Sequence, residues 1–233
     1  MIGTLNESPL HEALKFHYLE HHADPGAQLE VPVNGFVADV LCGQQIFEIQ
    51  TAGLGTMRRK LNLLLPDYQI VVVLPVAVRS VIIKLSQDND GTFTRRRSPK
   101  RGTLLSVLDE LVSVPELLNH PNFTLEVALI EQELIRTYSD SARRGRGGWR
   151  TVERRLLSVL DTHRFGCAGD LWTLLDNDLS EPFGTAELAL ALGSKRSVAQ
   201  KYAYCLRGAE QIAQVGKQGN ALLYSRVPIQ ETV

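Results

Sequence analysis

The stretch Gly35–Gln50, GFVADVLCGQQIFEIQ, constrains the fold more than any other part of the chain, because it indicates two short strands joined by a polar turn. Alternate residues of an extended strand share a face. Glu48 and Gln50 are therefore expected on one side of their strand, with Asp39 on the paired strand beside them. Two carboxylates and an amide at one end of a small sheet form an arrangement that a hard divalent cation accepts.

The elements around this stretch follow a recognisable order. Ser8 and Pro9 are typical of an N-cap and a first helical residue, so a helix is expected to start there and to fade by 23–26. Asn34-Gly35 is a tight hairpin signal between the first two strands. The apolar run 68–75 is typical of a strand buried on both faces. The expected order is a helix, strands over 28–33, 36–41 and 45–50, a helix over 56–65, and the buried strand.

This order, together with the spacing of Asp39 and Glu48, resembles the PD-(D/E)xK nuclease superfamily over residues 8–85. The resemblance implies a restriction-endonuclease-like α/β domain, a mixed central sheet flanked by helices, that cleaves phosphodiesters. It implies that Asp39 and Glu48 bind Mg²⁺, with Mn²⁺ as a substitute, and that Glu12 or Glu20 assists. The family's lysine is replaced by Gln50, which orients water or a phosphate oxygen but carries no charge. Alternatively, Asp39 closes a turn and Glu48 is a solvated strand residue.

A basic segment follows a further strand over 81–85 and a turn over 88–91. Its cations are Arg95, Arg96, Arg97, Lys100 and Arg101. A basic loop bounded by Pro and Gly next to a nucleic-acid site is expected to clamp phosphates, and the alternative is a solvated turn. A helix over 103–118 and a strand over 123–131 complete the first domain, residues 1–138.

Residues 139–150 are expected to form a basic, Gly-rich linker, because Gly and Ser loosen the chain and Arg keeps it solvated. Residues 151–233 form the second predicted domain. A helix is expected over 151–165, followed by a short apolar segment at 170–175, helices over 186–192 and 195–208, and a hairpin around Gly216–Asn220. This order resembles the winged helix-turn-helix, a small α+β domain.

The last of these helices is expected to present a polar face to DNA. Cations there can contact phosphates, while Arg and Gln can pair with base edges. The expected DNA-binding residues are Lys195, Arg196, Gln200 and Lys201 on the helix and Lys217 at the hairpin tip. Alternatively, the domain binds protein and this face is merely solvated.

Bulk properties set limits on the remaining choices. The formal net charge of −1 does not by itself indicate a nucleic-acid partner, so any basic surface that binds one has to be local. The three cysteines form no CxxC pair, which argues against a disulfide framework or a zinc knuckle. No apolar run is long enough to span a bilayer, and no secretory signal is visible, so a cytoplasmic protein without a membrane partner is expected.

The sequence therefore predicts a DNA-binding protein, a Mg²⁺-dependent nuclease-like phosphodiesterase delivered to its target by a winged helix. The alternative is a non-catalytic transcriptional regulator with a degenerate nuclease fold, kept as a binding or homodimerisation platform. A purely structural adaptor is a third interpretation.

Overall fold

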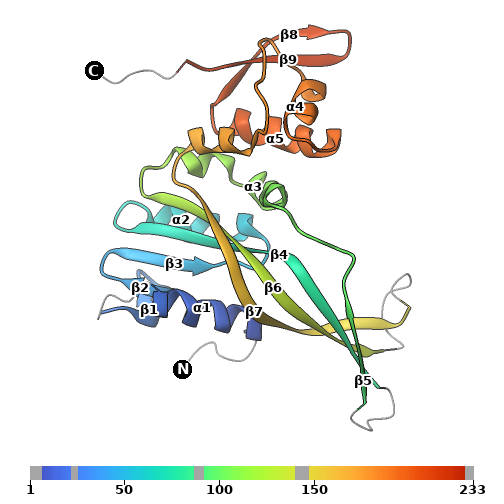
Figure 1. Cartoon of the computed structure of the whole chain (residues 1–233). Coiled ribbons are helices and arrows are strands. Elements are labelled where there is room, and N and C mark those ends of the chain that lie inside the picture. The colour runs from blue at the N-terminus through green and yellow to red at the C-terminus, as the bar shows by residue number, and fades with distance from the viewer. Residues whose placement is uncertain (1–6, 22–25, 87–91, 140–146, 229–233) are drawn as a thin grey trace. The chain divides into compact units, whose positions relative to one another are not determined.

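The computed structural model describes residues 7–21, 26–86, 92–139 and 147–228, and it is an α/β protein with a large mixed sheet and flanking helices (Figure 1). The sheet has seven strands in the order β1-β2-β3-β4-β6-β7, with β5 paired to β4. The turn predicted at 88–91 and most of the predicted linker at 139–150 lie outside the described residues. No helix in the described ranges is both long enough and apolar enough to cross a membrane.

The chain forms two compact units, each assembled from separate stretches. The first comprises 1–51, 73–103 and 127–163, and the second comprises 52–72, 104–126 and 164–233. This division differs from the sequence-based one, which placed contiguous domains on either side of a linker. It arises because the long strands contribute residues to both units.

The first unit is built on the expected helix and three-strand meander. Helix α1 (Pro9–His21) lies against strands β1 (Gln28–Val33), β2 (Phe36–Cys42) and β3 (Gln45–Ile49). The Asn34-Gly35 hairpin is confirmed, since both residues have positive φ and Val33 pairs with Phe36. Tyr18 of α1 contacts Phe47 of β3 with ring centroids 5.6 Å apart, so apolar burial fastens the helix to the meander.

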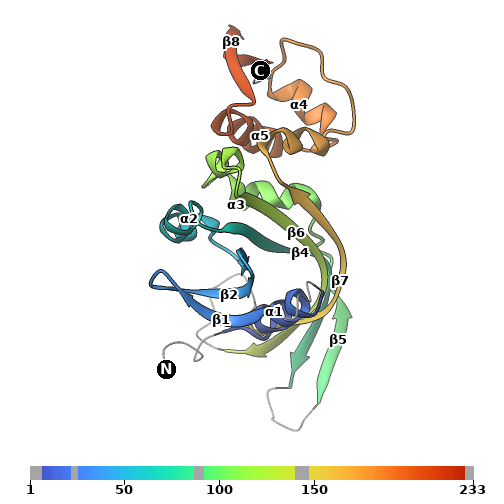
Figure 2. The same cartoon turned by 90° about the vertical axis from the view of Figure 1, so that its left-hand side faces the viewer.

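Strands longer than expected supply the rest of the sheet. The two strands predicted at 68–75 and 81–85 are one 17-residue strand, β4 (Gln69–Leu85). Strand β5 (Phe93–Arg97) runs antiparallel to the end of β4 (Figure 2). Strand β6 (Phe123–Tyr138) continues beyond the predicted 123–131.

The helix predicted over 151–165 is wrong, because these residues form strand β7 (Trp149–Phe165), the neighbour of β6. Leu156, Val159 and Leu160 have helical spacing, but β7 is mostly exposed and gains its stability from backbone pairing. The long edge of β6 offers unpaired N–H and C=O groups, and pairing with them outweighs local periodicity. The predicted winged helix therefore lacks the leading helix that the sequence assigned to it.

Short helical elements make up much of the second unit. They are η1 (Leu54–Met57), α2 (Arg58–Leu64), η2 (Leu104–Val107), α3 (Leu108–Leu111), η3 (Pro115–Asn119) and η4 (Ala168–Leu174). The helix predicted over 103–118 is thus broken into three pieces, and Pro115 begins the last of them.

The C-terminal part of this unit has the predicted pair of helices and hairpin. Helix α4 (Thr185–Ala191) packs against α5 (Arg196–Gly208), and β8 (Ile212–Gln218) pairs antiparallel with β9 (Ala221–Arg226). Phe183, just before α4, forms an antiparallel bridge with Tyr224 of β9. The fully buried Tyr202 ring of α5 meets the Trp172 ring of η4 edge-on, and its hydroxyl donates to the carbonyl of Leu171 at 2.9 Å.

Candidate functional site

The first polar cluster lies at the start of α1. Ser8 caps this helix as predicted: its carbonyl accepts from the N–H groups of His11 and Glu12, and its hydroxyl accepts from the His11 N–H at 3.3 Å. The helix therefore begins at Pro9, and His11 projects from its first turn.

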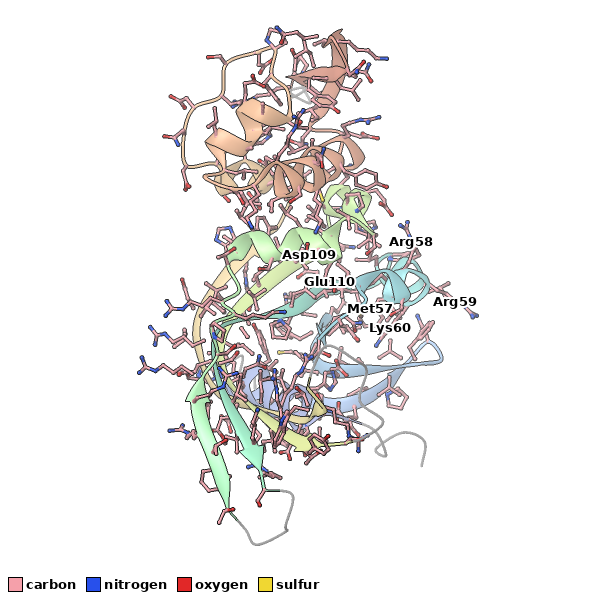
Figure 3. The ribbon with its side chains drawn as sticks, turned by 90° about the vertical axis from the view of Figure 1, so that its right-hand side faces the viewer. Met57, Arg58, Arg59, Lys60, Asp109 and Glu110 are labelled. Carbon is pink, nitrogen blue, oxygen red and sulfur yellow. The ribbon has the colours of Figure 1, made fainter. Side chains whose placement is uncertain are left out.

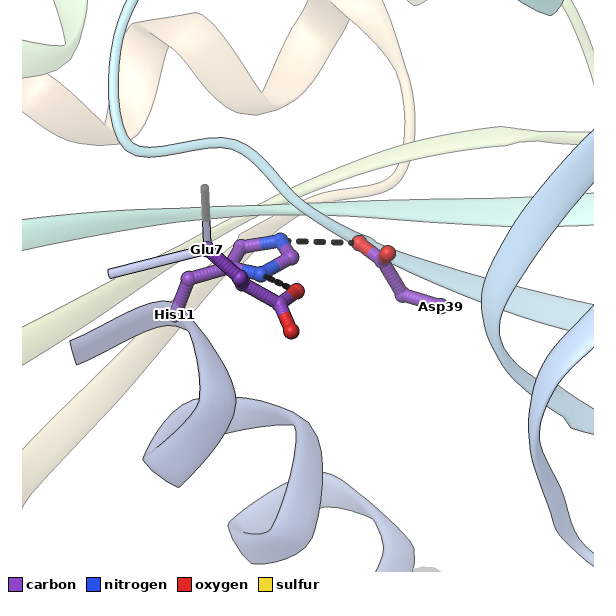
Figure 4. A group of neighbouring side chains, drawn as sticks. All are labelled: Glu7, His11 and Asp39. Atoms are coloured by element: carbon purple, nitrogen blue, oxygen red, sulfur yellow. Dashed lines mark hydrogen bonds and ion pairs between the residues drawn. The ribbon is translucent and has the colours of Figure 1, made fainter. Parts of the chain in front are cut away.

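His11 lies between two carboxylates (Figure 4). Its Nε2 is 3.2 Å from Asp39 Oδ2 on β2, and its Nδ1 bonds to Glu7. Burial alone would lower the pKa of His11, but the hydrogen bond and charge of Asp39, with those of Glu7, outweigh burial and raise the pKa overall. One ligand atom from each of Glu7, His11 and Asp39 lies within 4.8 Å of the other two.

Lys15, one turn after His11, extends this cluster into the core. The residue is 3% exposed, and its Nζ donates to Glu7 at 2.7 Å and to Glu30 of β1 at 2.8 Å. Burial would lower the pKa of Lys15, but the hydrogen bonds to Glu30 and Glu7 reverse that effect and raise it. Sequence reasoning missed Lys15, because a lysine on a helix is usually solvated and no local pattern marks this one as buried.

The predicted site residues are brought together only in part. Asp39 Oδ2 accepts from the Ile49 N–H at 2.8 Å, next to Glu48 in the chain. Glu48 itself is 3% exposed, although the sequence pattern predicted a carboxylate in contact with a wet sheet edge. Gln50 is half-buried and its N–H donates to Val73 of β4, while Glu12 and Glu20 are exposed on α1. Among the acidic, histidine and cysteine residues that the structure describes, those gathered with Asp39 are Glu7 and His11, not Glu48 or Glu12.

The basic segment is a strand rather than a loop over its first half. Arg95, Arg96 and Arg97 belong to β5, and all three are exposed, as are Lys100 and Arg101 after the strand. Arg95 is 3.2 Å from Glu133 of β6. Backbone pairing with β4 thus fixes which of these arginines share a face.

One exposed cation of the second unit, Arg58, is held by an acid. Arg58 and Arg59 project outward from α2 (Figure 3). Arg58 forms an ion pair with Glu116 of η3 and donates to the Ser113 carbonyl at 2.5 Å. On α3, Glu110 accepts from the Leu54 N–H at 2.9 Å, which ties this helix to η1.

The polar face predicted for the last helix is exposed on α5, as expected. The exposed residues are Lys195, which caps the helix, and Arg196, Ser197, Gln200, Lys201, Tyr204 and Arg207. Lys201 is less free than the others to bind a ligand, because its ammonium group forms an ion pair with Asp109 of α3. Gly208, seven residues after Lys201, lies on the same side of α5 and comes close to Pro115 of η3. Arg196 donates to the Thr185 hydroxyl at 3.3 Å.

Apart from the side of α5 that carries Lys201, the helix has one stripe of exposed polar residues. Arg196, Gln200, Tyr204 and Arg207 recur at intervals of three or four residues, so they occupy one side of the helix. Lys217 and Gln218 are exposed at the tip of the β8–β9 hairpin. Two cations, an amide and an aromatic ring thus share one solvent-facing strip.

Comparison with known proteins gives one family and one relative. A family model described as a domain of unknown function (DUF8091) matches residues 8–166. An uncharacterized protein of Treponema pallidum (strain Nichols) is 34% identical over 192 residues, which cover 81% of this chain and 73% of that protein. No solved structure matches the chain significantly.

Proposed function

This chain belongs to the DUF8091 family, and we propose that it is a DNA-binding protein that contacts duplex DNA through the exposed stripe of α5. The observation that carries the proposal is the stripe of Arg196, Gln200, Tyr204 and Arg207. Between its first and last residue it extends about 16 Å along the helix, at 1.5 Å per residue. That length suits a helix lying in a major groove.

The elements around α5 support the same function. Helix α4 packs against α5 and a hairpin follows, which matches the last two helices and the wing of a winged helix-turn-helix. Arg196 and Arg207 suit phosphate oxygens or guanine edges, and Gln200 suits adenine. Lys217, exposed at the hairpin tip, would suit a contact with the DNA backbone of the kind that a wing makes.

Salt dependence of duplex binding tests this proposal. Neutralising one phosphate-binding cation should reduce the slope of log K against log salt by about 0.9. The double variant Arg196→Ala/Arg207→Ala is expected to bind a mixed-sequence duplex more weakly and with a flatter slope. Arg154→Ala is the matched control, because Arg154 is an exposed arginine of β7. Equal slopes for the double variant and the control would contradict the proposal.

A second candidate function, metal-dependent phosphodiester hydrolysis, is favoured by the gathering of Glu7, His11 and Asp39. Two carboxylates and an imidazole suit Mn²⁺ better than Mg²⁺, because Mg²⁺ prefers oxygen ligands in a strict octahedron. Glu7, His11 and Asp39 would hold the ion, which would supply Lewis-acid polarisation of a phosphoryl oxygen. The non-catalytic alternative is supported by His11 itself, whose raised pKa favours a cation that neutralises both carboxylates.

Calorimetry separates these alternatives. MnCl₂ and MgCl₂ are titrated into the wild type, Asp39→Asn and the control Glu12→Gln, which changes an exposed acid of the same helix. A metal site predicts heat that Asp39→Asn abolishes and Glu12→Gln retains, together with metal-dependent nicking of plasmid DNA. If no variant binds either ion and plasmid stays intact, the catalytic candidate is lost and DNA binding by α5 still stands.

A further inference from the structure

A second basic feature of the first unit is a polar pocket of about 420 Å³. Its polar lining is Arg79 and Ser80 of β4, Arg97 of β5, Ser98 and Arg101 of the following segment, and Glu131 of β6. Three arginines therefore line one concave volume, and Glu131 is the one acidic residue among the lining residues.

Strand pairing brings these side chains together. Val81 of β4 pairs with Arg97 of β5, and Arg79 lies two residues before Val81, so Arg79 and Arg97 are on the same face of the sheet. The chain then returns along β4, where the Ser98 N–H donates to the Ser80 carbonyl at 2.8 Å. Arg101 is thereby carried back to the pocket.

Gly102 fixes the return of this segment. Its N–H donates to the Ala77 carbonyl at 2.8 Å, and a Cβ at this position would lie 2.6 Å from Val76 and 2.9 Å from that carbonyl oxygen. Only glycine allows the backbone so close to β4. Arg101 is thus positioned by backbone contacts on both sides, at Ser98 and at Gly102.

The charges of the pocket are poorly compensated. In the part of the chain that the structure describes, Arg79, Arg97 and Arg101 form no ion pair, whereas Arg95 on the same strand is paired with Glu133. Three cations against Glu131 leave a local excess of positive charge. Arginine presents planar donors that match the oxygens of phosphate, and several arginines around one volume can share a single phosphate group.

We propose that this pocket binds a phosphate group carried by a nucleotide or by a nucleic-acid strand. The pocket volume exceeds that of a phosphate alone, and Glu131 can accept a hydrogen bond from a sugar hydroxyl or a base amino group beside it. The proposal refines the basic segment to Arg79, Arg97 and Arg101, and excludes Arg96 from the pocket. It does not depend on DNA binding by α5.

The test titrates inorganic phosphate, AMP and a single-stranded oligonucleotide into the full chain by calorimetry. Arg97→Ala and Arg101→Ala are each expected to weaken binding about tenfold, the worth of one charge-assisted hydrogen bond. Arg96→Ala should leave affinity unchanged, because Arg96 is exposed on the same strand but does not line the pocket. Glu131→Gln should tighten phosphate binding several-fold, since it removes the opposing charge.

The outcomes separate the two sources of phosphate. Binding of AMP and phosphate identifies a nucleotide-sized ligand, and binding of the oligonucleotide alone identifies a strand backbone; both support the pocket. Equal losses in Arg96→Ala and Arg97→Ala, or no binding of any probe by the wild type, would overturn it. The same AMP titration in Arg196→Ala/Arg207→Ala is expected to match the wild type, which separates this proposal from that for α5.

Discussion

Replacement of Lys15 by methionine is expected to destabilise the protein, because it removes the cation of the cluster under α1. Methionine keeps the apolar stem of the side chain but leaves Glu7 and Glu30 without their buried partner. Lys15 is 3% exposed and donates at 2.7 and 2.8 Å to these two carboxylates. Removing one member of a buried pair is costly because the remaining charge loses its compensation.

The expected loss of unfolding free energy follows from how exposed the two carboxylate partners of Lys15 are. The Glu7 and Glu30 side chains are 25% and 46% exposed, so water screens both carboxylates in part. A fully buried pair would cost about 3–5 kcal/mol, and the two partly solvated bonds reduce this to about 2 kcal/mol. At about 2–4 °C per kcal/mol for a chain of this size, the melting temperature should fall by about 4–8 °C.

Thermal and urea unfolding of Lys15→Met measure this effect against Lys100→Met, a control that changes an exposed lysine after β5. In a double-mutant cycle, Lys15→Met with Glu30→Gln should show coupling below about 1 kcal/mol, because Glu30 is half in water. If Lys15→Met melts within a degree of the Lys100 control, the cluster contributes no net stability and the reasoning fails.

Three further outcomes follow from particular contacts. Burial raises the pKa of the Cys205 thiol to about 12, so Cys205 should resist thiol reagents at pH 8 in the folded protein while the exposed Cys167 reacts. The free energy of unfolding should also fall as the pH rises above the ordinary thiol pKa of 9.0, because only the unfolded thiol ionises there. Equal labelling rates would contradict this. Gly208→Ala should destabilise by about 1–3 kcal/mol in denaturant titration, because its Cβ would lie 2.4 Å from Pro115; an unchanged midpoint would show that η3 yields. Gly35→Val should cost about 1–2 kcal/mol, since valine resists the φ of +82° there, and a neutral result would mean that the hairpin turn rearranges.

Local signals in the sequence predicted the elements whose stability is local. Ser8-Pro9 fixed the start of α1, and Asn34-Gly35 fixed the first hairpin, because each acts on neighbouring backbone groups. The exposed face of α5 was also predictable, since its apolar and polar residues alternate with a helical period.

Elements that depend on distant pairing were not predictable in the same way. Residues 151–165 carry leucines at helical spacing, yet β6 recruits them as strand β7. The end of the long strand β4 likewise pairs with β5, through residues 81–85. The hydrophobic pattern of β4 itself carries no sign of this partner. Intrinsic preference is a weak prior that tertiary pairing overrides.

The candidate site shows the same limit at the level of side chains. Asp39 was identified from strand alternation. Its partners are His11 on α1 and Glu7 just before that helix, and no local sequence pattern links residues so far from Asp39 in the chain. Lys15 escaped notice because a lysine on a helix is usually solvated, and only its neighbours Glu7 and Glu30 make burial tolerable.

Photo-crosslinking from Tyr204 tests the central claim most directly. Tyr204 lies in the middle of the α5 stripe and is 58% exposed, so benzoylphenylalanine can replace it without disturbing the core. The account predicts a covalent adduct with a bound duplex from this position and none from Leu157, a 45% exposed residue of β7. Equal yields at the two positions, or no adduct at Tyr204 under conditions where the duplex is bound, would contradict it.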